Sequence, residues 1–186
     1  MSDFYELAHA AEADPAGANF AALRQAYVQS DAYRPYKHIS QQKLMQITNS
    51  VADFQEVVNT CLNILQGNAL DLEARMTLAI AYEKIGKSDE ARKTHLFAEH
   101  MLDAILATGD GKSFESAFRL VADTEAWTVM RSFGIKARSH TRHRRDDGVF
   151  DVFEGKIDDR AVTVYFDVTD HVRVVDAMMI DDEPEN

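Results

Sequence analysis

The stretch LEARMTLAIAYEKIGKSDEARKTHLFAEHMLD, residues 72–103, decides the fold of this chain. Gly86 divides it into two helical segments and opens the turn between them. Small and aromatic side chains stand where two antiparallel helices must approach closely. These side chains are Leu78, Ala79, Tyr82, Ala91 and Ala98. The stretch therefore predicts a helical hairpin that is held together through small residues.

This pattern resembles a tetratricopeptide repeat, a helix-turn-helix unit of about 34 residues. The resemblance implies a scaffold that holds partners and does not itself carry out chemistry. Counting back by one unit gives a more degenerate copy at 38–71, whose interior places are taken by Leu44, Met45, Phe54 and Val57. A free-standing stack needs about three units. We therefore expect the N-terminal helices and the C-terminal part to cap this shorter stack.

Helices are also expected outside the central hairpin. Pro15 and Gly17 separate a helix at about 2–13 from a second one at about 18–30. A further helix is predicted at about 114–133, because its apolar side chains recur with a helical period. They are Phe114, Ala117, Phe118, Val121, Trp127 and Met130.

The period of the sequence changes after Gly134. Apolar and polar residues alternate over 162–168, which predicts a half-buried strand. Gly148–Ile157 is expected to be its hairpin partner, across a turn at 158–160. Ile135–His143 is a candidate third strand of the same small sheet.

We therefore predict an α+β fold that is mainly α. Tetratricopeptide-like antiparallel helical hairpins are followed by a small C-terminal antiparallel β-sheet. The expected helical body spans residues 1–133, with its hairpins at about 38–105. The sheet is expected at 134–180, packed on the helical body, and residues 181–186 form an acidic tail.

The composition restricts the kinds of partner. The chain has 186 residues, a formal net charge of −11 and a single cysteine, Cys61. This charge repels nucleic acid and anionic membranes at long range, and it either favours a basic protein partner or serves solubility alone. No stretch approaches the roughly 20 apolar residues that cross a bilayer, and Met1–Ala13 lacks the basic start of a signal peptide. We expect a cytoplasmic protein that binds neither nucleic acid nor membrane.

Four short motifs occur in a fixed order along the chain. They are Ser30-x-x-Tyr33-x-Pro35-Tyr36, Gly109-Asp-Gly-Lys-Ser113, Phe150-Asp-Val152 and Val164-Tyr-Phe-Asp-Val168. Their order and spacing resemble the bacterial family called domain of unknown function 4919, over about Phe20–Val168. The resemblance implies a bacterial origin and a helical body with a β-hairpin. It carries over no catalytic residue and leaves the function open.

The glycine-rich motif at 109–113 looks like the end of a phosphate-binding P-loop. Leu106 stands where that loop requires its first glycine, and a helix is expected before it instead of a strand. One interpretation is a connector between two helices, with a glycine at positive φ and a serine that caps the next helix. The other is a backbone anion site. It would be formed by Gly109, Gly111, Lys112 and Ser113.

A run of basic residues follows the change of period. On a strand, alternate residues share one face. That face would carry Lys136, Arg138, His140, Arg142 and Arg144. One interpretation is neutralisation within the sheet by Asp151, Glu154 and Asp167 on neighbouring strands. The other is an exposed groove for an acidic peptide or a phosphate group, with Arg138, His140, Arg142 and Arg144 as partner-binding residues.

Aromatic and basic residues also cluster after the second predicted helix. Tyr33, Arg34 and Tyr36 lie there close to Tyr27 and Lys37. They form either a packed cap over the repeat stack or a recognition lip, since tyrosine and arginine are favoured at binding hot spots. Trp127 is expected to lie in the core, or half-buried with its N–H paired.

The sequence offers no metal site and no catalytic residue. His95 and His100 are five residues apart, so on a helix they point in different directions. His140 and His143 fall on opposite faces of a strand. Cys61 lies on the apolar face of its helix and is expected to be a small buried residue. We expect no cofactor.

Three hypotheses about function follow. The first is a protein-binding module, such as an adaptor, a toxin-neutralising partner or an assembly factor, which uses a helical-repeat surface. The second is an enzyme or a small-ligand or anion sensor, with a pocket between helices and sheet. Its polar groups would be Lys112, Ser113, His140 and Asp151. The third is a self-assembling protein that forms a homodimer.

Overall fold

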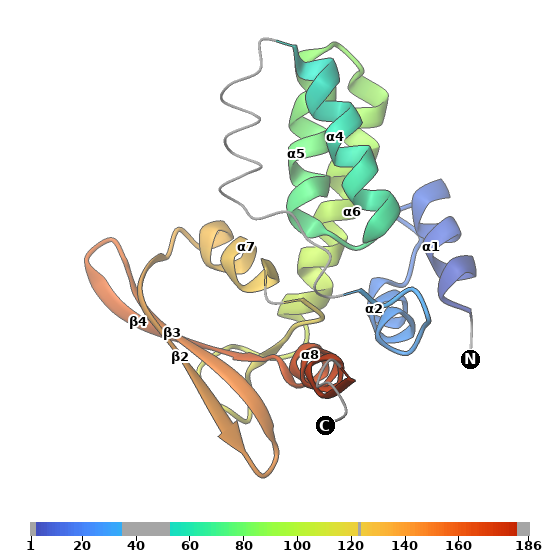
Figure 1. The fold of residues 1–186 in the computed structure, drawn as a ribbon. Coiled ribbons are helices and arrows are strands. Elements are labelled where there is room, and N and C mark those ends of the chain that lie inside the picture. Colours follow the sequence, from blue (N-terminus) through green and yellow to red (C-terminus); the bar gives the residue numbers. More distant parts are fainter. Residues whose placement is uncertain (1–2, 35–52, 123, 182–186) are drawn as a thin grey trace. The chain divides into compact units, whose positions relative to one another are not determined.

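The computed structural model in Figure 1 describes residues 3–34, 53–122 and 124–181, with side chains as far as residue 177. The described residues form seven helices and four strands, so the predicted α+β, mainly α fold is confirmed. The chain divides into two compact units, Met1–Ala104 and Ile105–Asn186. Expectations for the first helix of the 38–71 copy, including Leu44 and Met45, lie outside the described residues, as does the 182–186 part of the expected tail.

The first unit is helical, and polar caps set where its helices begin. Its helices are α1 (Phe4–Ala13), α2 (Phe20–Val28), α4 (Phe54–Gly67), α5 (Leu72–Lys84) and α6 (Ser88–Leu106), which runs two residues into the second unit. In the first four, the residue before the helix accepts a hydrogen bond from a backbone N–H of the first turn. These capping residues are Asp3, Asn19, Asp53 and Asp71.

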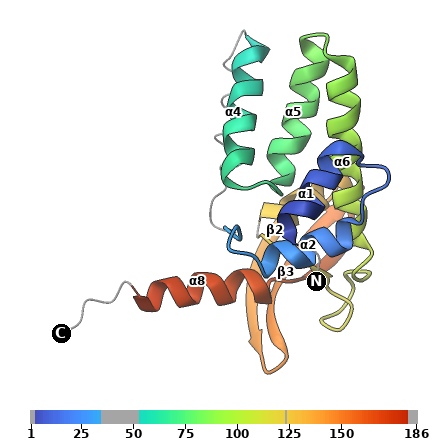
Figure 2. The same ribbon diagram turned by 90° about the vertical axis from the view of Figure 1, so that its right-hand side faces the viewer.

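Helices α4, α5 and α6 lie side by side in both views (Figures 1 and 2). Gly86 turns the chain between α5 and α6 with φ +78°, a conformation that glycine adopts without steric cost. Ala79, Ala91 and Ala98 are 0%, 2% and 5% exposed, so all three small residues of the predicted hairpin are buried. Between α4 and α5, Cys61 packs with Val57 and Leu78, as its apolar neighbours in the sequence led us to expect.

Buried polar contacts tie the first unit together. Arg75 on α5 is buried, and its guanidinium lies 3.7 Å from the centre of the Phe97 ring of α6. Its Nη2 donates to the Ala69 carbonyl oxygen at 3.0 Å and pairs with Glu12 on α1. The Tyr27 hydroxyl of α2 donates to Asn68 Oδ1 at 2.9 Å. Arg75 thus links α5 to α1 and α6, and Tyr27 links α2 to Asn68, the residue that follows α4.

The second unit contains the sheet. Its strands are β1 (Phe118–Arg119), β2 (Lys136–Arg145), β3 (Gly148–Ile157) and β4 (Arg160–Asp167), in the order β1-β4-β3-β2. The three long strands are antiparallel neighbours, and β1 pairs with β4 in parallel. The three predicted strands are therefore confirmed. Asp158 and Asp159 form the turn between β3 and β4 with positive φ, as aspartate tolerates better than most residues.

The predicted helix at 114–133 is wrong in its first half. Helix α7 spans only Thr124–Ser132, and residues 111–117 form bends and a turn before β1. The apolar side chains of this segment cover the sheet instead of one helix face. The Phe114 ring contacts the rings of Phe150 and Tyr165, and the Phe118 ring contacts that of Phe166. Ser113 therefore caps no helix.

Helix α8 (Thr169–Asp181) follows the sheet and was not predicted. It begins directly after β4, where the Asp167 carboxylate accepts a hydrogen bond from the Thr169 N–H at 2.9 Å. The sequence pattern had placed these residues in the sheet. Helix α8 supplies Asp176, which pairs with Arg144 of β2.

Candidate functional site

Strand β2 is an exposed edge of the sheet. Within the described residues it pairs only with β3, and all ten of its residues, Lys136–Arg145, are exposed. The opposite edge is β1, which has two residues. An edge strand keeps alternate backbone N–H and C=O groups free of a sheet partner. β2 therefore combines a long backbone edge with five fixed positive charges and no carboxylate.

A bulge interrupts the predicted alternation of the basic side chains. Ala137 pairs with Gly155 and Ser139 pairs with Glu154, so Arg138 is the extra residue between the two pairs. After the bulge the register is regular as far as the hairpin turn. The predicted single stripe from Lys136 to Arg144 therefore holds only for His140, Arg142 and Arg144.

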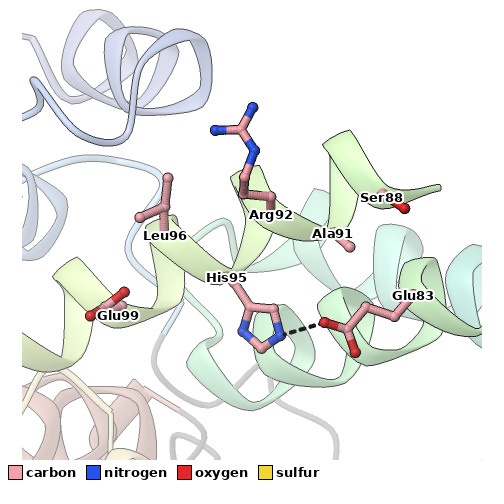
Figure 3. A pocket seen from close by; sticks show the side chains of 7 residues that line it. All are labelled: Glu83, Ser88, Ala91, Arg92, His95, Leu96 and Glu99. Carbon is pink, nitrogen blue, oxygen red and sulfur yellow. Dashed lines mark ion pairs between the residues drawn. The ribbon is translucent and has the colours of Figure 1, made fainter.

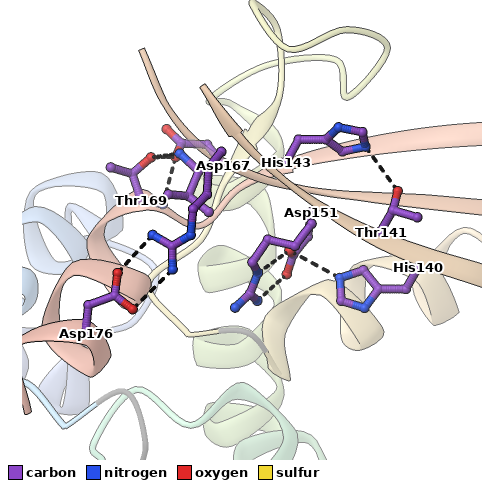
Figure 4. A network of polar contacts seen from close by, with 10 residues as sticks. His140, Thr141, His143, Asp151, Asp167, Thr169 and Asp176 are labelled. Atoms are coloured by element: carbon purple, nitrogen blue, oxygen red, sulfur yellow. Dashed lines mark hydrogen bonds and ion pairs between the residues drawn. The ribbon is translucent and has the colours of Figure 1, made fainter. Parts of the chain in front are cut away.

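Two of these basic residues hold one buried carboxylate. Asp151 on β3 is 3% exposed, and it accepts hydrogen bonds from Arg142 Nε at 2.7 Å and Nη2 at 2.8 Å. His140 Nε2 lies 3.2 Å from Asp151 Oδ1 (Figure 4). Burial raises the pKa of the Asp151 carboxyl, but its bonds to Arg142 and His140 outweigh this effect and leave the pKa below its ordinary value. Asp151 fixes both side chains on one face of the sheet.

The outer arginines pair with exposed carboxylates. Arg144 Nη1 and Nη2 donate to the two carboxylate oxygens of Asp176 on α8, at 2.9 and 3.2 Å. The hydrogen bond from Arg144 lowers the pKa of Asp176. Arg145 Nε donates to Asp147 Oδ1 at 3.0 Å, and its guanidinium lies over the Phe114 ring. Exposed pairs of this kind contribute about 0–1 kcal/mol each, so these cations remain available to a stronger partner.

The predicted internal neutralisation is therefore only partial. Of the three expected acids, Asp151 pairs with an arginine, whereas Glu154 accepts a hydrogen bond from Ser139 Oγ at 2.9 Å and Asp167 accepts from Thr169. In the described part of the chain, Lys136 and Arg138 have no side-chain partner. Sequence reasoning missed Asp176, because a helix was not expected there.

Exposed aromatic rings lie on the same side of the sheet as His140. The His140 ring stacks on the buried Phe153 ring with centroids 4.5 Å apart, and Trp127 of α7 meets the edge of Phe153 at 5.1 Å. Trp127 and Phe133 are each 44% exposed. The expectation that Trp127 lies in the core is wrong, because Phe153 takes the core position and the indole covers it from outside.

The hydrogen-bond donors of the glycine-rich loop bind an acceptor within the loop itself. Lys112 donates to Asp110 through its backbone N–H at 3.0 Å and through Nζ at 2.9 Å, and Ser116 Oγ donates to the same carboxylate at 2.6 Å. These hydrogen bonds, the one from Ser116 above all, lower the pKa of Asp110 to about 2. The N–H of Gly111, which has φ +67°, donates to the Ser116 carbonyl oxygen. The Asp110 carboxylate thus occupies the place of an external anion.

The remaining predicted anion-site residues are also engaged near this loop. Ser113 Oγ lies 3.2 Å from Ser116 Oγ. A Cβ on Gly109 would lie 2.2 Å from the Ser116 carbonyl oxygen, so this glycine permits the close approach of two backbone segments. The geometry is that of a tight connector that covers the sheet.

The aromatic-basic cluster belongs to the helical unit. Tyr33 is buried, with its ring 5.1 Å from that of Tyr27. Arg34 Nη1 donates to the carbonyl oxygens of Asp31 and Tyr33. Tyr36 and Lys37 lie outside the described residues. Tyr33 therefore packs against α2, whereas the basic residues of β2 belong to the other unit.

Two pockets are lined by described residues of the helical unit. One, of about 400 Å³, follows α5 and α6, and His95 Nε2 lies 3.3 Å from Glu83 Oε1 beside it (Figure 3). It is lined by Glu83, Ser88, Ala91, Arg92, His95, Leu96 and Glu99. The other, of about 470 Å³, lies between α1 and α2. Neither is lined by Lys112, Ser113, His140 or Asp151.

The described residues hold no group of three histidine, cysteine or acidic side chains that could bind a metal ion. None of their helices is long and apolar enough to cross a membrane.

Comparison with known proteins places the chain in a family. No curated protein and no solved structure matches it. The family model described as domain of unknown function (DUF4919) matches residues 11–176, which is most of the chain. The four ordered motifs that suggested this resemblance all fall inside the matched range. This chain therefore belongs to the DUF4919 family.

Proposed function

We propose that this chain is a protein-binding module of bacterial origin, which acts as an adaptor, a toxin-neutralising partner or an assembly factor. The observation that carries the proposal is strand β2, all of whose residues are exposed, and whose His140 packs on the same Phe153 ring as the exposed Trp127. Arginine and tryptophan are enriched among the residues that dominate binding energy at protein interfaces. The partner-binding residues we propose are Arg138, His140, Arg142 and Arg144.

The helical unit supports the same class of function as a scaffold. We propose that α4, α5 and α6 form a tetratricopeptide-like stack. The antiparallel course of α5 and α6, the turn at Gly86 and the burial of Ala79 and Ala91 support it. Repeats of this kind present surfaces to partners.

Charge favours a protein partner over a nucleic acid. A net charge of −11 opposes the approach of a phosphate backbone to the molecule as a whole. A short peptide segment, in contrast, interacts mainly with the local positive charge of β2. We propose a cytoplasmic setting, which suits the single buried thiol of Cys61.

Affinity capture with matched variants tests the proposal. The full chain, the Arg138→Glu variant and the Arg160→Glu variant are used in parallel as bait with lysate of the native organism. Both variants change the charge by the same amount, but Arg160 lies on β4, which is not the β2 edge. We expect a stoichiometric protein partner that Arg138→Glu loses and Arg160→Glu keeps. Absence of any stoichiometric partner, together with turnover in a small-molecule screen, would contradict the proposal.

A further inference from the structure

The edge strand also specifies how a partner binds and what chemistry it carries. Resting on the proposed function, we infer that the partner contributes an extended acidic segment, which adds to the outer edge of β2 as a new strand of the sheet. This binding mode uses the backbone of β2 for affinity and its side chains for specificity.

The backbone supplies the first argument. β2 is ten residues long, and in the described residues only β3 lies beside it in the sheet. Its bulge at Arg138 lies near its start, so the regular register from Ser139 to Arg145 leaves a straight edge of seven residues. A strand of this length is typical of pairing in globular proteins, where strands are about 5–6 residues long.

Charge selects an acidic ligand and disfavours a second copy of this chain. A partner strand places its side chains directly opposite those of β2, and like charges in that position are destabilising. Pairing of β2 with β2 of another copy would oppose lysine and arginine to lysine and arginine. Aspartate or glutamate at the end of the ligand that extends past Ser139 would instead meet Lys136 and Arg138, which have no side-chain partner in the described part of the chain.

The face of the sheet that carries Asp151 is ordered before any ligand arrives. Asp151 holds Arg142 with two hydrogen bonds and His140 with one contact, and His140 also stacks on Phe153. These side chains lose little conformational freedom on binding, which favours affinity. Trp127 lies on the same face and meets Phe153. The ligand is therefore expected to carry acidic side chains and an apolar one at every second position, on the face that meets His140, Arg142 and Trp127.

Selection of peptides on the intact protein tests this inference. A library of random twelve-residue peptides displayed on phage is selected against the immobilised full chain. The selected peptides are then synthesised and titrated, with the fluorescence of Trp127, the single tryptophan, as the readout. Each peptide is also made with N-methyl groups on alternate backbone nitrogens, which keeps its side chains and charge but removes the donors that a new strand needs.

We expect acidic peptides whose affinity falls at least about tenfold on N-methylation. Arg138→Glu is expected to weaken them about tenfold, and Arg160→Glu by less than about twofold. Enrichment of no acidic peptide, or equal binding of the N-methylated peptides, would overturn the inference. So would equal competition by a thymidine dodecamer, since that would make β2 a general polyanion site.

The outcome separates this inference from the proposed function. If lysate capture yields a stoichiometric partner that Arg138→Glu retains, the chain is a protein-binding module that uses another surface, and only the inference fails. If capture yields no partner and the selection yields no acidic peptide, both fail.

Discussion

The Arg142 guanidinium binds the buried Asp151 carboxylate through two parallel hydrogen bonds, Nε to Oδ1 at 2.7 Å and Nη2 to Oδ2 at 2.8 Å. Two groups of basic residues on β2 differ in this respect from Arg144 and Arg145, which pair with the exposed Asp176 and Asp147. Arg142 and His140 are held by the sheet itself, whereas Lys136 and Arg138 have no side-chain partner in the described part of the chain. The first group is held in a fixed position on the surface, and the second carries positive charge with which a ligand can pair.

Loss of the Asp151 carboxylate should destabilise the sheet unit. Asp151→Asn removes the charge from a buried group that accepts bonds from Arg142, and hydrogen bonds to charged groups contribute about 1.5–3 kcal/mol. We expect a loss of about 1–3 kcal/mol in the free energy of unfolding. Urea unfolding followed by the fluorescence of Trp127 reports on this unit. The matched variant Asp176→Asn, at the exposed pair with Arg144, should cost less than about 1 kcal/mol. Equal losses in both variants would contradict this reading.

The same carboxylate should make stability depend on pH in the acid range. The pKa of Asp151 is lowered in the folded protein, and an unfolded aspartate has a pKa of about 3.9. Its contribution to stability is therefore complete above the unfolded pKa and is lost as the pH falls through the folded value. The urea midpoint of the wild type should fall more steeply in this range than that of Asp151→Asn. Parallel pH profiles for the two proteins would show that Asp151 is not the source.

Gly111 should tolerate a side chain less well than Gly134. Both have φ +67°, so alanine pays the same backbone cost of roughly 1–2 kcal/mol at either position. A Cβ at Gly111 would lie 2.4 Å from Phe118 Cε2, whereas a Cβ at Gly134 meets nothing within 4 Å. Gly111→Ala is expected to cost about 1–3 kcal/mol more, measured by urea unfolding with Trp127 as the probe. If both variants lose the same stability, the loop does not pack on Phe118 as described.

Small residues should be required inside the helical unit. Ala79 is 0% exposed, so Ala79→Leu forces additional atoms into a packed space and should cost about 1–3 kcal/mol. Ile80, the next residue on α5, is 46% exposed, and Ile80→Leu should change stability by less than about 0.5 kcal/mol. Thermal unfolding followed by far-UV circular dichroism compares the two. A stable, unaltered Ala79→Leu variant would remove the main support for a tetratricopeptide-like stack.

The sequence predicted the regular elements where one period dominates. The alternation over 162–168 and the glycine at position 86 are local signals, and the strand and the turn between α5 and α6 form where they indicate. The prediction of a helix at 114–133 was wrong in its first half, because the apolar residues of this segment belong to two different structures. Phe114 and Phe118 cover the sheet, and the helix starts only at Thr124.

The candidate site could be predicted only in part, for a similar reason. The basic run at 136–145 and the pairing of Arg142 with Asp151 follow from strand geometry. The bulge at Arg138, the reach of Asp176 from α8 and the exposure of Trp127 depend on contacts between elements that are distant in sequence. No local pattern contains that information.

Amide hydrogen exchange on the complex with the captured partner gives the decisive comparison of bound and free protein. If the partner adds a strand to β2, alternate backbone amides within Lys136–Arg145 should exchange at least about tenfold more slowly in the complex, while amides of the β3–β4 turn at Asp158 and Asp159 are unchanged. Protection confined to α4, α5 and α6, with β2 exchanging as in the free protein, would contradict strand addition at this edge.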